Sequence, residues 1–340
     1  MFRKAYFLLL FTACSGDNRT PLVIYSPHGR DLLTLFEQRF EALHPDVDVR
    51  WLDMGSQDVY DRVRSERANP QADIWFGGPS LILAQAAADS LLDCARPSWA
   101  DAIPARGRGE GDCYLAAYET PAVFLYAEQV VPAADAPQDW EDLLDPRWRD
   151  KLIVRDPLAS GTMRAVFGLI MLRSQKFPGD TGSGFAWLRR LDGQTKAYEQ
   201  NPALISEKIA RQEGLVTVWD LPDVLISRRR GMPVGYVFPR SGTVAIEDGI
   251  AVVRGAKHLA AARAFIEFVG SPEMQLAAAR EVYRVPARLD LPTDSLPEWV
   301  RDVRRRMVVA DVDWRLVAER GPEWMRWWDQ HVRGTGAKAR

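Results

Sequence analysis

Short apolar runs alternate with segments of helical periodicity in the first part of the chain. Residues 22–25 are an apolar run, and in the following DLLTLFEQRFEALHP apolar residues recur every three to four positions. Asp31 can cap the start of this helix and Pro45 stops it. The alternating VDVRWL, a helix over 57–68, the run DIWFGG and a helix over 79–92 come next. This order of strands and helices predicts a parallel sheet with right-handed crossovers.

A second block of the chain repeats this pattern. DKLIVRDPLASGTMRAVFGLIMLR and LVTVWDLPDVLISRR each have the pattern of a strand, a turn and a helix. Two extended stretches, one containing Thr120 and Pro121 and one containing residues 239–243, are candidate crossings between the blocks. We therefore predict an α/β fold of two lobes, with mixed sheets flanked by helices. The predicted parts are a leader and linker over 1–19, a first lobe over 20–119 and 243–300, a second lobe over 120–242, and C-terminal helices over 301–340 that pack on the lobes.

The N-terminal stretch MFRKAYFLLLFTACSGDNRT has the layout of a secretory signal. Arg3 and Lys4 precede an apolar run over 5–11, which is shorter than the roughly 20 residues that span a membrane. Cys14 follows a small residue, as in a bacterial lipobox, although Phe11 stands where leucine is usual. We predict export and lipidation of Cys14, which would anchor the protein on the periplasmic or extracellular face. An ordinary signal peptide with an incidental cysteine is the alternative.

The remaining cysteines agree with export. Cys94 and Cys113 are a pair 19 positions apart that can form a disulfide in an oxidising compartment, and two buried free thiols are the alternative. The chain of 340 residues is 47% hydrophobic, which suffices for two lobes with their own cores. Its formal charge of −2 gives no indication of a nucleic-acid partner.

Five segments carry a family resemblance: VIYSPHG, ADIWFGGPS, DWEDLLDPRWRDKLIVRDPLASGTM, SGTVAIEDGIAVVRGAKHLAAARAFIEFVGSPEMQ and DVDWRLVAE. They cover nearly the whole mature chain in order. In them the chain resembles the periplasmic solute-binding proteins of bacterial ATP-driven (ABC) importers, and more narrowly the extracellular solute-binding family with ferric-, thiamine- and phosphosugar-binding members. The resemblance implies a type II periplasmic-binding-protein fold, whose lobes close on a ligand in the cleft between them. It also implies a permease and an ATPase in the cytoplasmic membrane as partners, and we expect a monomer.

Candidate ligand-binding residues follow the strands of both blocks. In open α/β sheets ligands bind at the carboxyl ends of strands, which here are SPHGR, DMGSQ and FGGPS. In DPLASGTMR, Ser160, Gly161 and Thr162 stand at a helix start, where unpaired N–H groups and the helix dipole favour an anion. Arg164 can add a bidentate contact. The pattern favours a small phosphorylated or carboxylated organic molecule, bound by Ser26, His28, Ser56, Gly78, Thr120, Ser160, Gly161, Thr162, Arg164, Trp219, Asp220 and Ser241.

Iron is an alternative ligand. Ferric-binding members of the resembled family hold the metal with a histidine after the first strand, a glutamate after the third, and a tyrosine pair from the second lobe. His28 matches the first position, but Gly77 and Gly78 follow the third strand and VTVWDLPDV lacks the tyrosines. Fe(III) requires anionic oxygen ligands, so we expect no metal or cofactor. The alternative metal set is His28, Tyr198 and Asp220.

Two further functions complete the alternatives. Trp219 beside Asp220, together with Tyr198, can offer an aromatic face and a counter-charge to a thiamine-like cation. A hydrolase acting on a small phospho-ester belongs to a different class of protein. No H-E-x-x-H, G-x-S-x-G or Walker A pattern occurs, so the sequence predicts a binding protein and no enzyme.

Overall fold

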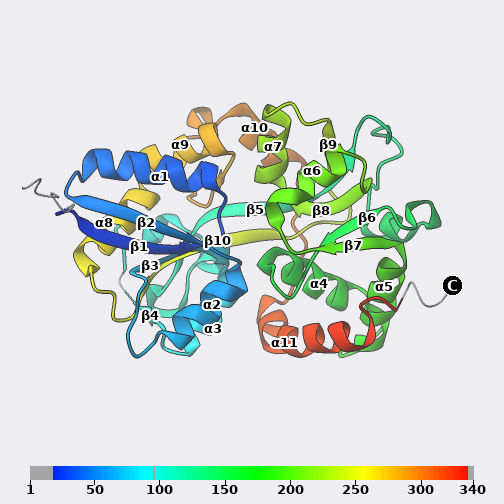
Figure 1. Cartoon of the computed structure of the whole chain (residues 1–340), viewed down its shortest axis with the longest axis horizontal. Helices are drawn as coiled ribbons and strands as arrows, with labels where there is room; N and C mark the ends of the chain where they lie inside the picture. The colour runs from blue at the N-terminus through cyan, green and yellow to red at the C-terminus, as the bar shows by residue number, and fades with distance from the viewer. Residues whose placement is uncertain (1–17, 95, 336–340) are drawn as a thin grey trace, which may run out of the picture.

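The computed structural model describes residues 18–94 and 96–335. It has two α/β lobes side by side along its long axis (Figure 1). The predicted α/β class is confirmed, with a mixed sheet flanked by helices. Cys14 and the predicted signal segment lie outside the described residues. Within the described ranges, no helix is long and apolar enough to cross a membrane.

The first lobe begins with the predicted alternation of strands and helices. Its elements are β1 (Thr20–Ser26), α1 (Arg30–Leu43), β2 (Val47–Asp53), α2 (Ser56–Ser65), β3 (Ile74–Pro79), α3 (Ser80–Ala88) and β4 (Leu92–Asp93). β1 pairs in parallel with both β2 and β3. Leu32, Phe36 and Phe40 of α1 are buried, because their helical spacing places them on one face. The second helix ends at Ser65, three residues before the predicted end.

The second lobe has its own core. It contains β6 (Leu152–Arg155), α4 (Gly161–Arg173), α5 (Thr181–Gln194), β7 (Thr195–Glu199), α6 (Ile205–Ala210), β8 (Val216–Asp220), α7 (Leu221–Arg229) and β9 (Val234–Val237). β6 pairs in parallel with β7 and β8. Each strand therefore points its carboxyl end in the same direction, and the loops after β6, β7 and β8 lie at one edge.

The strands β5 (Leu115–Ala127) and β10 (Ala245–Val253) run between the lobes (Figure 1). The first half of β5 pairs with β10 and β11 (Val285–Pro286), and its second half pairs with β8 and β9. The sheet consequently runs without interruption in the order β2-β1-β3-β10-β5-β8-β6-β7. Thr120 and Pro121 lie near the middle of β5, and residues 239–243 connect β9 to β10.

The C-terminal helices cover both lobes. α8 (Leu259–Gly270) and α9 (Pro272–Val282) contact α1 of the first lobe, and α10 (Glu298–Arg306) packs into the core that contains Val123 and Val234 of the strands β5 and β9. α11 (Trp314–His331) lies on α4 and also touches α3. Trp324 and Trp328 of α11 are buried in the core of the second lobe. They are packing residues of this core.

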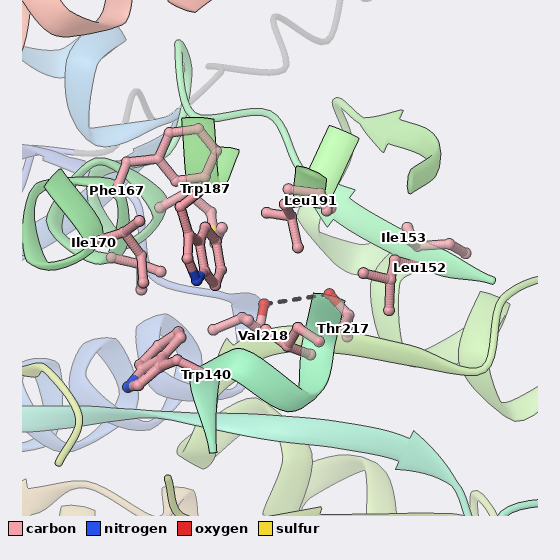
Figure 2. Close-up of a pocket in the computed structure, with 13 residues that line it drawn as sticks. Trp140, Leu152, Ile153, Phe167, Ile170, Trp187, Leu191, Thr217 and Val218 are labelled. Carbon is pink, nitrogen blue, oxygen red and sulfur yellow. Dashed lines mark hydrogen bonds between the residues drawn. The ribbon is translucent and has the colours of Figure 1, made fainter. Parts of the chain in front are cut away.

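A small cavity lies inside the second lobe (Figure 2). Its volume is about 20 Å³, and apolar side chains that include Trp140, Phe167 and Trp187 surround it. The Thr217 hydroxyl at its wall donates a hydrogen bond to the Val218 carbonyl, as the dashed line in Figure 2 shows. Because a cavity of this size holds about one water molecule, it is a packing defect and cannot accept an organic solute.

A disulfide joins Cys94 and Cys113 in the first lobe. The structure thus selects the bridged form of the two alternatives that the sequence left open.

Replacing both cysteines by serine should lower the free energy of unfolding by about 3 kcal/mol, because a bridge across 19 positions restricts the unfolded chain. Urea unfolding of the oxidised protein and of the Cys94→Ser/Cys113→Ser variant measures the difference. A reducing agent should shift the midpoint of the natural chain and leave that of the variant unchanged. Equal midpoints for the two proteins would contradict the prediction.

Candidate functional site

A cleft of about 610 Å³ lies between the lobes. Its walls are the loops and helix starts that follow β1, β2, β6, β7 and β8, so it lies at the carboxyl ends of strands from both lobes. The lining residues that carry the argument below are Gly29, Arg30, Asp31, Gly55, Asp58, Arg155, Ala159, Trp219, Asp223, Arg230 and Arg284.

Helices from both lobes begin at this cleft. Gly29, Gly55 and Asp220 are the N-caps of α1, α2 and α7, and within the described chain none of these caps makes a side-chain hydrogen bond to its helix. α4 begins beside the cleft residue Ala159, and the Ser160 hydroxyl accepts a hydrogen bond from the Met163 amide there. The positive ends of these helix dipoles therefore face the space between the lobes.

His28 is buried beside the cleft after β1. Its backbone N–H donates to the Ser26 hydroxyl over 3.1 Å, and its ring packs edge-on against Phe76. Gly77 has a φ of +108°, and a Cβ there would lie 2.5 Å from the imidazole Cε1, so this position requires glycine. Burial, and then the charge of Arg284, lower the pKa of His28 well below its ordinary value. Neither ring nitrogen has a hydrogen-bond partner among the described residues.

Asp248 brings residues of several strands together. Its carboxylate accepts hydrogen bonds from the Gly78 amide over 3.0 Å and from the Thr120 hydroxyl, and it lies 4.0 Å from Nε2 of His28. The pairing of β10 with β3 and β5 is irregular next to Asp248, as in a β-bulge, and bulges re-aim side chains near functional sites. Burial raises the pKa of Asp248, while Arg284, Thr120 and Gly78 oppose the shift.

Asp220 occupies the end of β8. The Thr162 hydroxyl at the start of α4 donates to its Oδ2 over 3.2 Å, and its Oδ1 is buried with no hydrogen-bond partner within 18–94 and 96–335. Burial, together with the neighbouring carboxylates Asp223 and Asp248, raises the pKa of Asp220 well above its ordinary value. This side chain carries free hydrogen-bonding capacity next to the cleft.

Sequence reasoning missed Arg284 and Tyr118. Arg284 lines the cleft with 5% of its surface exposed, and its Nε has no partner in the described part of the chain. The hydroxyl of Tyr118 is fully buried and likewise has no described partner. In the sequence, Arg284 is a single cation in the apolar stretch VYRVPA, and Tyr118 lies in the extended stretch LAAYETP. Neither pattern by itself indicates a binding site.

Contacts between the lobes show that this is a closed arrangement. Arg230 of α7 pairs with Asp31 of α1 at 2.7 Å, and Arg164 of α4 donates to the Gln57 side chain of α2. A Cβ on Gly161 would lie 2.6 Å from Cδ of Pro79 and 3.2 Å from the Ser56 hydroxyl, both on the opposite lobe. Arg164 therefore joins the lobes and does not line the cleft, and Gly161 permits their close approach.

Of the twelve ligand-binding residues predicted from the sequence, Trp219 alone is among the described residues that line the cleft. Ser241 and the alternative metal ligand Tyr198 make their contacts elsewhere. Ser241 accepts a hydrogen bond from Arg173 and donates one to Asp139 at an exposed position. The Tyr198 hydroxyl donates to Asp192 over 2.7 Å and its ring packs on Trp328, because β7 turns this side chain toward α11. Tyr198 therefore cannot join His28 and Asp220 as a metal ligand. Among the described residues, no group of three or more His, Cys, Asp or Glu side chains is placed to hold a metal ion.

The chain is similar to known binding proteins over most of its length. It is 25% identical over 317 residues to a protein of Sinorhizobium fredii named as an ABC transporter periplasmic-binding protein, covering 90% of this chain and 84% of that one. It is 28% identical over 256 residues to a protein of Salmonella typhimurium named for periplasmic 2-aminoethylphosphonate binding, covering 73% and 72% of the two chains.

Solved structures share the fold. The periplasmic binding protein AfuA from Actinobacillus pleuropneumoniae, with fructose 6-phosphate bound, matches with a TM-score of 0.80 at 22% identity, over 93% of this chain and 99% of that one. The family model described as bacterial extracellular solute-binding protein matches residues 37–305. With its two closed lobes and the cleft between them, the chain belongs to the family of bacterial extracellular solute-binding proteins, and it is a binding protein and not an enzyme.

Proposed function

We propose that the chain captures a small organic anion, a phosphate, phosphonate or carboxylate, in the cleft between its lobes. The chain is the substrate-binding component of an ABC importer and acts outside the cytoplasmic membrane, where such components deliver their solute to a permease and an ATPase. The observation that carries the proposal is the convergence of the starts of α1, α2, α4 and α7 on one cleft. Helix N-termini bind anions through free N–H groups and the helix dipole.

The size of the cleft and the four arginines in its lining support an anionic solute, although Asp31, Asp53, Asp58, Glu207 and Asp223 also line it. Its volume of about 610 Å³ lies in the range of about 300–1,000 Å³ that is usual for sites of small molecules. Arg30, Arg155, Arg230 and Arg284 line it, and guanidinium groups bind phosphate and carboxylate oxygens with paired hydrogen bonds. The Salmonella relative is named for a phosphonate and the AfuA structure holds a phosphate ester, which agrees with this chemistry.

Capture would proceed by rotation of the lobes. We propose that residues 20–119 with 243–300 move against residues 120–242 about the shared strands β5 and β10. A solute that touches both walls binds the closed form more tightly and shifts the population toward it. The pair Arg230–Asp31 and the contact Arg164–Gln57 add to closure, and because both lie at partly exposed positions each contributes only modestly.

The Fe(III) alternative lacks support at this site. The turn after β3 has no carboxylate of its own, and the Asp248 carboxylate is already engaged by Gly78 and Thr120. Hard Fe(III) requires several anionic oxygen ligands, and Tyr198 lies elsewhere. We further propose that the protein is a monomer held at the membrane by lipid on Cys14.

Titration of the metal-stripped protein with small ligands tests the solute class. Organic phosphates, phosphonates and dicarboxylates are compared with thiamine and with Fe(III) plus citrate in a thermal-shift assay. A ligand at about 100 times its dissociation constant stabilises the fold by about 2.7 kcal/mol. We expect this shift from an organic anion without metal. A shift only with Fe(III), or only with thiamine, would overturn the proposal.

Replacing Gly161 by valine should hold the lobes apart, because its Cβ would meet Pro79 of the opposite lobe. If the closed population falls to about 1%, the apparent affinity for the anion falls about hundredfold. The matched control is Gly321→Val in α11, where an added Cβ meets no described atom within 4 Å. Calorimetric titration measures affinity and circular dichroism the unfolding midpoint. Unchanged affinity in Gly161→Val would refute this mode of closure.

Replacing Cys14 by serine should release the protein from membranes. The natural chain, expressed in a Gram-negative host with labelled palmitate, should incorporate label and sediment with the membrane fraction, because acyl chains anchor a protein to the bilayer. The Cys14→Ser variant should be unlabelled and soluble in the periplasm. Equal labelling or equal distribution of both proteins would exclude lipidation at this residue.

A further inference from the structure

Behind the lining of the cleft lies a layer of carboxylates, called the floor below, that is more acidic than an anion site requires. Asp223 lines the cleft itself, whereas Asp220 and Asp248 lie behind the lining. The charges of Asp223 and Asp248 help to raise the pKa of Asp220, and that of Asp248 helps to raise the pKa of Asp223. Arg284 is the cation that opposes the shift at all three carboxyls. Arg155 also lies near Asp220, but Asp156 and Glu199 act on it more strongly, and its Nη1 already donates to the Glu199 carbonyl. Within the described residues, these carboxylates therefore exceed the positive charge beside them.

Buried polar atoms at this floor lack partners. Asp220 Oδ1, both ring nitrogens of His28 and the Tyr118 hydroxyl are buried without a hydrogen-bond partner in the described chain. His28 lies 4.0 Å from Asp248, and Tyr118 interacts with Asp248 and Arg284. His28 and Tyr118 are 4% and 0% exposed, so solvent does not satisfy them. A buried polar group without a partner costs free energy, which a ligand that supplies hydrogen bonds can recover.

We propose that this floor, formed by Asp220, Asp223, Asp248, His28 and Tyr118, is a subsite for a protonated amine. The proposal rests on the proposed function and names its substrate class: a small zwitterion whose anionic end lies at the helix starts and whose ammonium group lies at the floor, such as an aminoalkyl phosphonate or phosphate. An ammonium group donates three hydrogen bonds and accepts none. It is therefore the kind of donor that Asp220 Oδ1, the neutral imidazole of His28 and the phenol oxygen of Tyr118 lack.

The carboxylates of this subsite belong to different lobes, so their interaction changes when the lobes close. Asp248 lies on β10 against β3 of the first lobe, whereas Asp220 and Asp223 belong to β8 and α7 of the second. Closing the lobes brings like charges together, and this repulsion opposes closure of the empty protein. An ammonium group between them changes the repulsion to attraction. The solute thus supplies the differential interaction with the closed state that a population shift requires.

The experiment is a calorimetric titration at neutral pH with three probes. 2-Aminoethylphosphonate has both charges, ethylphosphonate lacks the amine, and fructose 6-phosphate offers hydroxyls in its place. We expect the zwitterion to bind at least tenfold more tightly than either of the other probes. The Asp220→Asn variant should lose this preference and bind 2-aminoethylphosphonate and ethylphosphonate with similar affinity. Asp311→Asn, an exposed substitution before α11, is the matched control and should bind all probes like the natural chain.

The outcomes separate this inference from the function on which it rests. Equal affinity for ethylphosphonate and the zwitterion would overturn the amine subsite and leave the anion proposal intact. A preference for fructose 6-phosphate that Asp220→Asn removes would also overturn it, because the carboxylates would then bind hydroxyls. Binding of none of the probes, with binding of other organic anions, would overturn the subsite alone. Binding of no anion at all would overturn both proposals. Asp220→Asn should unfold no earlier than the natural chain, so a loss of preference cannot come from misfolding.

Discussion

The hydrogen bonds that Asp248 accepts at the junction of β3, β5 and β10 fix the geometry on which the site depends. The Gly78 amide and the Thr120 hydroxyl come from strands far apart in the sequence, and one carboxylate holds them together. The irregular pairing beside Asp248 aims it inward, and a Cβ on the neighbouring Gly249 would lie 2.1 Å from Cδ1 of Leu83. The same side chain therefore supports the crossing strands and belongs to the floor behind the lining of the cleft.

The site combines opposite electrostatic demands. Helix starts and four arginines bring positive charge to the walls, whereas Asp220, Asp223 and Asp248 bring carboxylates to the floor. In the empty protein this arrangement lowers the stability of the closed form, because buried like charges cost free energy. A binding protein gains selectivity, because a solute that matches both demands relieves the strain in the closed form only.

Packing of α4 on β3 and of α11 on α3, together with two polar pairs, joins the lobes in this form. Arg230 with Asp31 and Arg164 with Gln57 lie at partly exposed positions, where a pair contributes little. The shared strands β5 and β10 keep the lobes connected in any state.

The sequence by itself determined the class of fold and the order of its elements. The sequence shows the apolar periodicity of α1, the stop at Pro45 and the extended stretches at Thr120 and 239–243. Each of these patterns depends only on residues close together in the chain, so it can be recognised without the structure. His28, Thr162 and Asp220 could be proposed because they follow strands or start helices, and strand ends meet at one edge of a parallel sheet. Only the tertiary structure decided which polar residues meet across the lobes. The structure places Arg284 and Tyr118 at the site and places Ser241 and Tyr198 elsewhere. The pairing of distant strands and the direction of each side chain determine these positions, and neither can be read from the sequence.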